Sequence, residues 1–269
     1  MRRIVHLSDL HFGWNESGLV ETLCALVIKA KPDLTVLSGD FVEHATRAEF
    51  AQARKFIADL PKPVLMVPGN HDLPFYNLPL RLIQRLSLYK EYITPELAPF
   101  YQDEEMAVMG VDTARIWPIR GGSISAMQVR DVEQRLCHLP PHITRVLVTH
   151  HPFDLPAEFK GRYLVKKGEA ALERLACCLD LLLAGHMHVG ASGRVADRFK
   201  TPNGALVFSQ AGTAISKRYK GERNSFNVIE VDGPRLRLQK YSWDADQSAY
   251  EAECGEVLEF LMRECDESV

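Results

Sequence analysis

The sequence predicts an α/β protein, and three observations lead to that class. Short apolar runs typical of buried strands alternate with segments whose apolar residues recur every three or four positions, as on one face of a helix. After residue 200 the helical pattern stops and strand-like segments follow one another. Several of the early apolar runs also end directly in polar residues, as expected where strands of an α/β sheet deliver side chains to a site.

Six apolar runs in the first part of the chain are expected to form strands, because each is short and turn-forming residues bound it. They occupy residues 3–7, 34–38, 64–68, 106–111, 145–149 and 179–184. Helical periodicity is found between them at residues 19–30, 47–60, 125–139 and 168–179. Ser125 stands where a helix N-cap is expected. Strands and helices of these lengths in alternation are typical of an α/β fold.

Three further strands are expected at residues 205–212, 225–232 and 235–243, joined by turns, one of them through Gly233-Pro234. We expect them to form a β-meander that completes a second sheet. The N-terminal part of the chain is then α/β, and the C-terminal part consists mainly of strands.

The whole chain, 1–269, is expected to form a single domain with two irregular parts. Residues 72–105 are broken by prolines and exceed the length of an ordinary connection, so they form either a lid over a binding site or a packed surface insertion. A helical stretch is expected near Leu80–Tyr92. The tail, 244–269, is expected to end in a short amphipathic helix and a frayed acidic terminus.

The composition is that of a soluble globular protein, with 46% hydrophobic and 25% charged residues. A net charge of −3 argues against a general nucleic-acid binder, and no apolar run is long enough to cross a membrane. The N-terminal residues lack the apolar stretch of a secretory leader, so we expect a cytoplasmic protein. The 6 cysteines form no CxxC pair and are expected to be reduced, mostly buried thiols.

Side chains that can bind metal ions follow five of the predicted strands. They are Asp9 and His11 after the first strand, Asp40 after the second, Asn70, His71 and Asp72 after the third, His150 and His151 after the fifth, and His186 and His188 after the sixth. In open α/β sheets, ligands bind beyond the carboxyl ends of the strands, so these side chains are expected to converge on one crevice.

The expected crevice holds carboxylate, amide and imidazole groups and no thiolate. This set suits Mn, Fe, Zn or Ni in a reactive site rather than a structural zinc site. One four-coordinate ion needs fewer ligands than are present, whereas two ions that share a carboxylate accommodate them. His186 and His188 then serve different ions, provided that the backbone leaves the strand between them. Glycines at 39, 69 and 185 directly precede ligands, where the backbone must turn sharply.

The ordered motifs D-x-H, G-D, G-N-H-D, H and G-H-x-H resemble the signature of the calcineurin-like metallophosphoesterases. The resemblance implies a four-layer α/β/β/α sandwich of two mixed sheets flanked by helices, with a dinuclear metal site at the strand ends. It implies two divalent or mixed-valence transition-metal ions, drawn from Mn, Fe, Zn, Co or Ni. By this resemblance one ion is held by Asp9, His11 and His188, the other by Asn70, His150 and His186, and Asp40 bridges both.

Two assignments within this resemblance concern neighbouring residues. In THHP, the family pattern favours His150 as the ligand, while His151 lines the pocket or packs. In GNHD, the resemblance implies that His71 contacts the phosphate and serves as the general acid, the alternative being phosphate binding alone. Asp72 beside it is expected to orient the imidazole and to keep it protonated. Two ions about 3.5–4 Å apart can hold a bridging hydroxide as the nucleophile.

The motifs SDLHFG, GNHD and THHP look closest to the bacterial cyclic-nucleotide phosphodiesterase-like branch. This implies a phosphodiesterase acting on a small phosphodiester, of which a cyclic nucleotide is one candidate. A phosphomonoesterase or protein phosphatase, and a pyrophosphohydrolase of lipid-linked nucleotides with 78–93 as a lipid-facing lid, are alternatives. A non-catalytic scaffold is disfavoured because every ligand position is retained.

The expected partner is a small phosphoester substrate, with no stable nucleic acid and no integral membrane segment, and a homodimer is left open. The basic loop 212–226 offers side chains that could meet the substrate's phosphates, although solvation is the more ordinary role for most of them. These are Lys217, Arg218, Lys220 and Arg223.

Overall fold

The computed structural model describes residues 1–74, 78–117, 119–156, 159, 163–195, 206–218 and 220–262. One six-stranded sheet has the strand order β12-β11-β10-β1-β2-β3. Strands β1, β2 and β3 run parallel, whereas β10, β11 and β12 are antiparallel to their neighbours. The bounds of these strands are Arg2–Leu7 for β1, Leu34–Leu37 for β2, Val64–Met66 for β3, Ser225–Asp232 for β10, Arg235–Asp244 for β11 and Ala249–Leu261 for β12.

The other six-stranded sheet has the order β4-β5-β6-β7-β9-β8, with β5, β6, β7 and β9 parallel and an antiparallel strand at each edge. Both sheets are therefore mixed. The strands are β4 (Phe100–Gln102), β5 (Met106–Val111), β6 (Thr144–Thr149), β7 (Leu181–Ala184), β8 (Ala191–Arg194) and β9 (Val207–Gln210).

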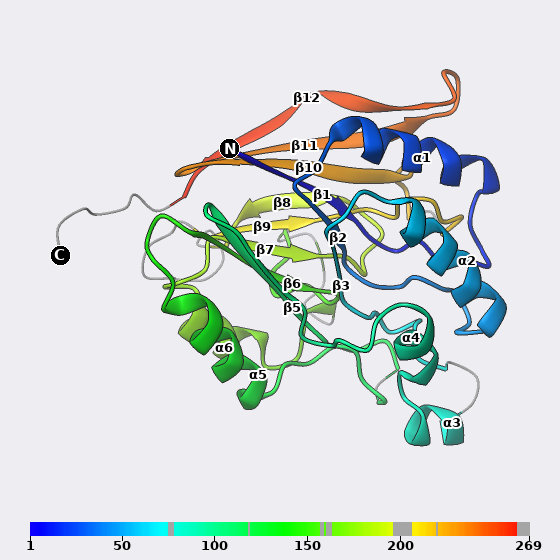
Figure 1. Ribbon diagram of the computed structural model, residues 1–269, viewed down its shortest axis with the longest axis horizontal. Helices are drawn as coiled ribbons and strands as arrows, with labels where there is room; N and C mark the ends of the chain where they lie inside the picture. The colour runs from blue at the N-terminus through cyan, green and yellow to red at the C-terminus, as the bar shows by residue number, and fades with distance from the viewer. Residues whose placement is uncertain are drawn as a thin grey trace.

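Helices cover the outer face of each sheet, as Figure 1 shows. Helices α1 (Ser17–Ala30) and α2 (Arg47–Asp59) lie on the first sheet. Helix α5 (Ala126–Val132), its π-helical continuation η1 (Glu133–Cys137) and α6 (Gly168–Leu175) lie on the second. The predicted N-cap at Ser125 is confirmed: its side chain accepts a hydrogen bond from the main-chain N–H of Gln128.

Hydrophobic residues on alternate positions of the strands divide the core into three layers. Along β1, Ile4 packs between the two sheets, while Val5 packs under the helices of the first sheet. Along β6, Val146 packs between the sheets and Leu147 under the helices of the second. Because successive side chains of a strand point to opposite faces, each sheet is buried on both sides. The predicted four-layer α/β/β/α sandwich is confirmed.

The expected β-meander does not lie in the second sheet. Strand β10 pairs with β1, and β11 and β12 follow it outward in the first sheet, so that of the three expected strands only β9 joins the second. The reason is the apolar character of both faces of β10. Its Ile229 packs between the sheets and its Val228 packs under the helices, as neighbours of β1 must. The expected tail helix is also wrong for the described residues, because 249–261 pair as a strand with β11; 263–269 lie outside them.

The segment 72–105 contains two short helices, α3 (Leu78–Ile83) and α4 (Ser87–Tyr92), and the edge strand β4. Tyr89 of α4 is buried in the core cluster of the first sheet. Arg81 of α3 is fully buried and donates hydrogen bonds to main-chain oxygens, among them those of Ile116 and Arg115. These contacts fasten α3 to the loop that follows β5.

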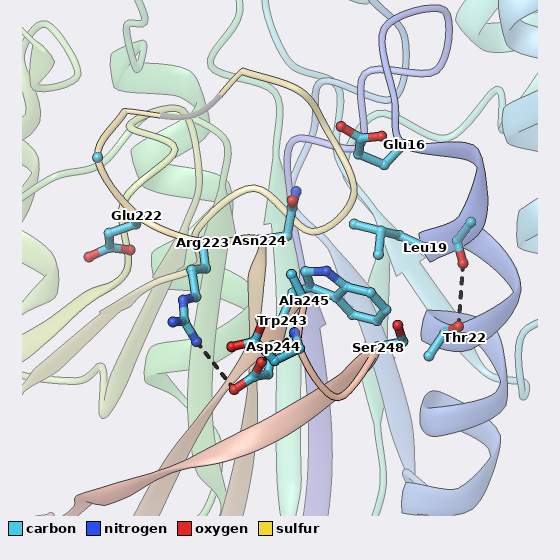
Figure 2. Close-up of a pocket in the computed structure, with 13 residues that line it drawn as sticks. Glu16, Leu19, Thr22, Glu222, Arg223, Asn224, Trp243, Asp244, Ala245 and Ser248 are labelled. Carbon is cyan, nitrogen blue, oxygen red and sulfur yellow. Dashed lines mark hydrogen bonds and ion pairs between the residues drawn. The ribbon is translucent and has the colours of Figure 1, made fainter.

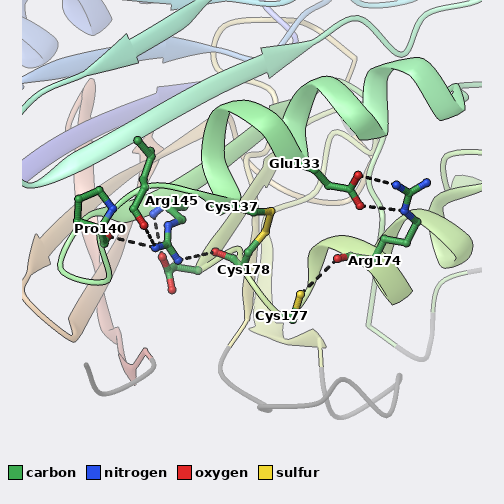
Figure 3. Close-up of a disulfide and its surroundings, with 9 residues drawn as sticks. Glu133, Cys137, Pro140, Arg145, Arg174, Cys177 and Cys178 are labelled. Carbon is green, nitrogen blue, oxygen red and sulfur yellow. Dashed lines mark hydrogen bonds and ion pairs between the residues drawn. A yellow bond between two sulfur atoms is a disulfide. The ribbon is translucent and has the colours of Figure 1, made fainter. Parts of the chain in front are cut away.

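The expectation of reduced thiols is wrong for one pair of cysteines. A disulfide joins Cys137 at the end of η1 to Cys178 just after α6, with their Cα atoms 5.1 Å apart (Figure 3). Helix packing brings together two residues that are 41 positions apart in the sequence. Cys24 and Cys177 are not joined by a disulfide, and Cys177 is exposed. None of the described helices is long and apolar enough to cross a membrane.

Candidate metal centre

The predicted site residues lie where five parallel strands end, and their side chains meet at one edge of the sandwich. Asp9 and His11 follow β1, and Asp40 follows β2. Asn70, His71 and Asp72 follow β3, His150 and His151 follow β6, and His186 and His188 follow β7. All of them are buried except His186, which is partly exposed. The structure therefore brings together all the candidate residues that the sequence suggested.

Five of these residues have left-handed backbone conformations, which non-glycine residues rarely adopt. Their φ angles are 52° at Asp9, 48° at His11, 53° at Asp40, 74° at His186 and 62° at His188. Such conformations are costly, and they gather at functional sites where the surrounding structure enforces them. Each one turns the chain out of its strand direction and aims the side chain into the shared crevice.

Glycine is required beside these ligands because side chains approach the backbone closely. At Gly39, φ is +96°, and an added Cβ would lie 2.6 Å from Nδ1 of His150. At Gly185, an added Cβ would lie 1.8 Å from Oγ of Ser8 and 2.6 Å from Oδ2 of Asp9. The expected role of these glycines in aiming the ligands is consistent with this crowding.

One group of metal-binding atoms surrounds Asp9. Nε2 of His188 lies 3.1 Å from Oδ1 of Asp9, and Nε2 of His11 lies 3.7 Å from the same oxygen. Nε2 of His11 is also 3.7 Å from Oδ2 of Asp40 and 3.2 Å from Nε2 of His188. One ligand atom from each of these four residues lies within 4.8 Å of all the others.

A second group surrounds His150. Nε2 of His150 lies 3.3 Å from Oδ2 of Asp40 and 3.3 Å from Nδ1 of His186. Asp40 therefore contacts both groups. His186 and His188 face different groups, and the chain turns between them. His151 also lies within the second group, with its Nδ1 3.0 Å from the hydroxyl of Thr113.

Unpartnered buried atoms show that the residues fit metal ions. Oδ1 of Asn70 is buried and has no hydrogen-bond partner among the described residues, and the buried Oδ1 of Asp9 is approached by imidazole nitrogens of its own metal-binding group. Buried polar atoms normally find a partner, because leaving one without costs about 1–3 kcal/mol. Carboxylate, amide and imidazole donors are the set that intermediate transition metals bind. Cations would satisfy these atoms.

The electrostatics of the crevice also favour positive charge. Burial lowers the pKa of His11, yet the nearby carboxylates of Asp9, Glu43 and Asp40 raise it to about 9 overall. Burial likewise lowers the pKa of His150, while the nearby Asp40 carboxylate raises it to about 9. The two carboxylates Asp9 and Asp40 thus create a field that stabilises cations at this position.

Glu43 is a member of the site that sequence reasoning missed. Its Oε2 lies 2.9 Å from Nδ1 of His11, on the side of the ring away from Asp9. A carboxylate in this position fixes the orientation of a ligating imidazole. Its Oε1 accepts a hydrogen bond from Nη2 of Arg218. No recognisable spacing marks Glu43 in the sequence, because its partners come from distant segments.

The hydrogen bonds of His71 differ from the expectation. Its Nδ1 lies 2.9 Å from the main-chain oxygen of Glu43, which can only accept, so Nδ1 carries the hydrogen. Its Nε2 lies 3.2 Å from Nη1 of Arg218, which can only donate, so this nitrogen accepts. These contacts select the neutral imidazole, and burial lowers the pKa of His71.

The expectation that Asp72 orients and protonates His71 is therefore wrong. The Asp72 carboxylate instead accepts hydrogen bonds from the main-chain N–H groups of Phe41, Val42 and Gly69. Burial and the negative charge of Asp40 raise the pKa of Asp72 to about 7. Asp72 thus joins the turn after β2 to the turn after β3, and it acts on the backbone that presents Asp40 and Asn70.

A pocket of about 500 Å³ opens onto this centre. Five of the predicted site residues line it together with five others from three loops. The lining residues are Asp40, Asn70, His71, Arg120, Gly121, Tyr163, His186, His188, Arg218 and Lys220. A volume of this size holds a small-molecule ligand.

Another pocket, of about 790 Å³, lies near the start of α1 and the turn between β11 and β12 (Figure 2). Trp243 and Asn224 line it, with Arg223 and Asp244 forming an ion pair at 3.5 Å. It contains none of the predicted metal ligands or catalytic residues, and of the candidate phosphate-binding side chains only Arg223 lines it. The candidate active site is therefore the pocket of about 500 Å³ at the metal centre.

The two-sheet sandwich, the carboxylate and imidazole clusters at its strand ends and the match to a family model together identify a metal-dependent phosphoesterase. Residues 2–190 match the calcineurin-like phosphoesterase family, and the chain belongs to that family. The resemblance seen in the motifs is thereby confirmed.

Relatives within the family carry phosphodiesterase names. The chain is 25% identical over 202 residues to a probable glycerophosphodiester phosphodiesterase of Arcobacter nitrofigilis, covering 69% of this chain and 71% of that protein. It is 24% identical over 201 residues to the 3′,5′-cyclic adenosine monophosphate phosphodiesterase of Escherichia coli, covering 69% of each. The fold is shared with the purple acid phosphatase PPD1 of yellow lupin, with a TM-score of 0.67 at 11% identity, over 93% of this chain and 52% of that one.

Proposed function

We propose that this protein is a phosphodiesterase that hydrolyses a small phosphodiester with the help of two transition-metal ions. The position of Asp40 carries the proposal, because its carboxylate contacts both groups of metal-binding atoms. A shared carboxylate is the arrangement that a pair of neighbouring ions requires. The phosphodiesterase names of the relatives support the choice of a diester.

The proposed ligand sets follow the two groups in the crevice. Asp40 belongs to both sets, and the donors are those that manganese, iron, zinc, cobalt and nickel accept. One ion would be held by Asp9, His11 and His188, and the other by Asn70, His150 and His186. When bound, such ions stabilise charge on phosphoryl oxygens and make a water molecule acidic enough to act as a nucleophile near neutral pH.

The remaining roles belong to residues of the chain. Arg218 lines the pocket and presents donor groups, so it is placed to bind a non-bridging oxygen of the scissile phosphate. His71 is the proposed general acid for the leaving alcohol. Its Nδ1 hydrogen is committed to the Glu43 main-chain oxygen, so the proton it donates must be carried on Nε2. An anionic phosphate that draws Arg218 toward itself would free that nitrogen.

The test compares two esters with the same leaving group. Protein reconstituted separately with Mn²⁺, Fe²⁺, Zn²⁺, Co²⁺ and Ni²⁺ is assayed with bis(4-nitrophenyl) phosphate and with 4-nitrophenyl phosphate. We expect the diester to give the higher kcat/KM with every active metal. A clearly better rate with the monoester would replace the proposal with a phosphomonoesterase while leaving the metal-dependent hydrolase intact.

A lipid-linked diphosphate ester is a second candidate substrate, favoured by one exposed apolar surface. The side chains of Leu82, Ile83 and Trp117 are 64%, 81% and 71% exposed, and Arg81 holds the segments that carry them together. Large apolar side chains gathered in the open mark a surface for a membrane or a lipid chain. Sedimentation with phospholipid vesicles, lost in a Leu82→Ser/Ile83→Ser/Trp117→Ser variant, would favour this candidate.

A further inference from the structure

Three cationic side chains border the pocket of the candidate metal centre, and they have different surroundings. Arg120, Arg218 and Lys220 all line this pocket. Among its described lining residues, Asp40 supplies the only carboxylate, and that carboxylate lies within the metal-binding groups. The charges of the arginines and the lysine therefore face the space in which a substrate would lie.

Arg218 is tied to the catalytic end of the pocket. It donates to the Glu43 carboxylate and to Nε2 of His71, and its guanidinium also lies 5.9 Å from the ring of Trp14. These contacts hold it beside the scissile phosphate position. The single negative charge of a phosphodiester is thereby already matched by the metal ions and Arg218.

Lys220 also lines the pocket, and the ring of Tyr163 connects it to the second group of ligands. Its Nζ is 5.9 Å from the centre of the Tyr163 ring, and that ring lies 6.4 Å from the ring of His186. Lys220 is exposed and forms no ion pair with the described acidic residues. Two other basic residues of the same loop do form ion pairs. Lys217 lies 3.9 Å from Glu16, and Arg223 pairs with Asp244.

Arg120 belongs to the loop after β5, which packs against His151 of the second group. An added Cβ at Gly122 would lie 2.3 Å from Cγ of His151, so the backbone of this loop rests on that ring. The N–H of Lys166 donates to the main-chain oxygen of Gly122 and fixes the loop in place. Arg120 is exposed, and no described acidic residue pairs with it. Arg120 and Lys220 thus both line the pocket, each in a segment that packs near residues of the second group.

Two cations that line one pocket and have no ion pair among the described residues repel each other, and an anion between them removes that repulsion. A phosphate group offers the charge and the acceptor oxygens that a guanidinium and an ammonium recognise. We propose that Arg120 and Lys220 form a subsite for a second phosphate group, carried by the alcohol part of the phosphodiester substrate. This inference rests on the proposed function and narrows its substrate class to phosphodiesters with an additional phosphate.

The test measures binding, so that it does not depend on turnover. Mn²⁺-loaded protein is titrated calorimetrically with propyl phosphate and with propane-1,3-diyl bisphosphate, which differ by one phosphate. The comparison is repeated with an Arg120→Ala/Lys220→Ala variant and with a Lys217→Ala/Arg223→Ala variant. The second variant removes the same amount of charge from the same surface region without touching the pocket.

We expect the bisphosphate to bind the unchanged protein about tenfold more tightly, which corresponds to two charge contacts of the usual exposed strength. The advantage should fall to about twofold in the Arg120→Ala/Lys220→Ala variant, since the bisphosphate offers two equivalent ends. It should persist in the Lys217→Ala/Arg223→Ala variant. An advantage of twofold or less in the unchanged protein, or one that survives loss of Arg120 and Lys220, would overturn the subsite. Failure of the proposed function appears separately, as absent hydrolysis of bis(4-nitrophenyl) phosphate.

Discussion

Among single residues, Asp40 contacts both metal-binding groups of the candidate centre. Its Oδ2 faces His11 at 3.7 Å and His150 at 3.3 Å, while its Oδ1 accepts from the main-chain N–H of His71 at 2.8 Å. One carboxylate therefore links both metal-binding groups and fixes the turn that carries the proposed acid. Replacing its charge should affect two ions and one loop at once.

We expect Asp40→Asn to lose metal more severely than a change outside the ligand shell. Outer-shell changes lower metal affinity by about 10–100-fold, so the loss of this ligand should exceed about 100-fold. Metal content after dialysis, measured by elemental analysis, checks this expectation. Asp59→Asn on the exposed side of α2 serves as the matched control. Retention of two ions by Asp40→Asn would show that this carboxylate is not shared.

His71→Ala should separate proton transfer from metal binding. We expect unchanged metal content and a fall in kcat of about 10²–10⁴, the usual contribution of a general acid. The loss should shrink for esters of good leaving groups such as 4-nitrophenolate, because these need little protonation. His142→Ala, at an exposed position, should change neither property. Equal losses for good and poor leaving groups would leave His71 with phosphate binding alone.

At the scale of secondary-structure elements, the segment around α3 shows how an insertion can be fastened beside a site. The fully buried guanidinium of Arg81 donates to main-chain oxygens on both sides of it, including those of Leu73, Pro74 and Ile119. These bonds tie the chain after β3 to the loop that carries Arg120. The position of the pocket rim thus depends on one side chain.

Arg81→Met should destabilise the protein and disturb the rim without removing any ligand. Buried carbonyl groups would lose their donors, and we expect a loss of about 2–3 kcal/mol in the free energy of unfolding. Chemical denaturation measures this loss. Arg54→Met on the exposed face of α2 should stay within about 0.5 kcal/mol of the unchanged protein. A similarly small effect of Arg81→Met would mean that the hydrogen bonds contribute little.

At the scale of the whole molecule, the centre joins the two halves of the sandwich. Asp9 and Asp40 follow strands of the first sheet, whereas His150, His186 and His188 follow strands of the second. Ions that bind residues from both sheets would act as cross-links between them. Metal binding is therefore expected to contribute to stability as well as to activity.

Removal of metal by EDTA should abolish hydrolysis and lower Tm. At a free metal concentration of 100 Kd, one bound ion stabilises the folded state by about 2.7 kcal/mol. For a chain of this size that corresponds to a shift of about 5–10 °C. Scanning calorimetry and elemental analysis should show restoration of Tm and activity as two Mn²⁺ ions per chain return. Full activity at one ion per chain would contradict the two-metal proposal.

The sequence by itself determined the class of fold and the candidate ligands. Both depend on local patterns, such as a short apolar run followed by G-D or G-H-x-H, and the carboxyl ends of parallel strands must meet at one edge. Local periodicity also gave the helix that begins after Ser125. These features require no knowledge of which distant segments become neighbours.

The tertiary structure alone decided features that depend on long-range pairing. The apolar faces of β10 placed the last strands beside β1 rather than in the second sheet. Packing of the helices brought Cys137 next to Cys178, and the loop after β9 brought Arg218 to Glu43 and His71. Asp72, adjacent to His71 in the sequence, turned toward backbone amides instead. Side-chain partners such as these follow from the direction of each turn in space, which spacing along the chain does not encode.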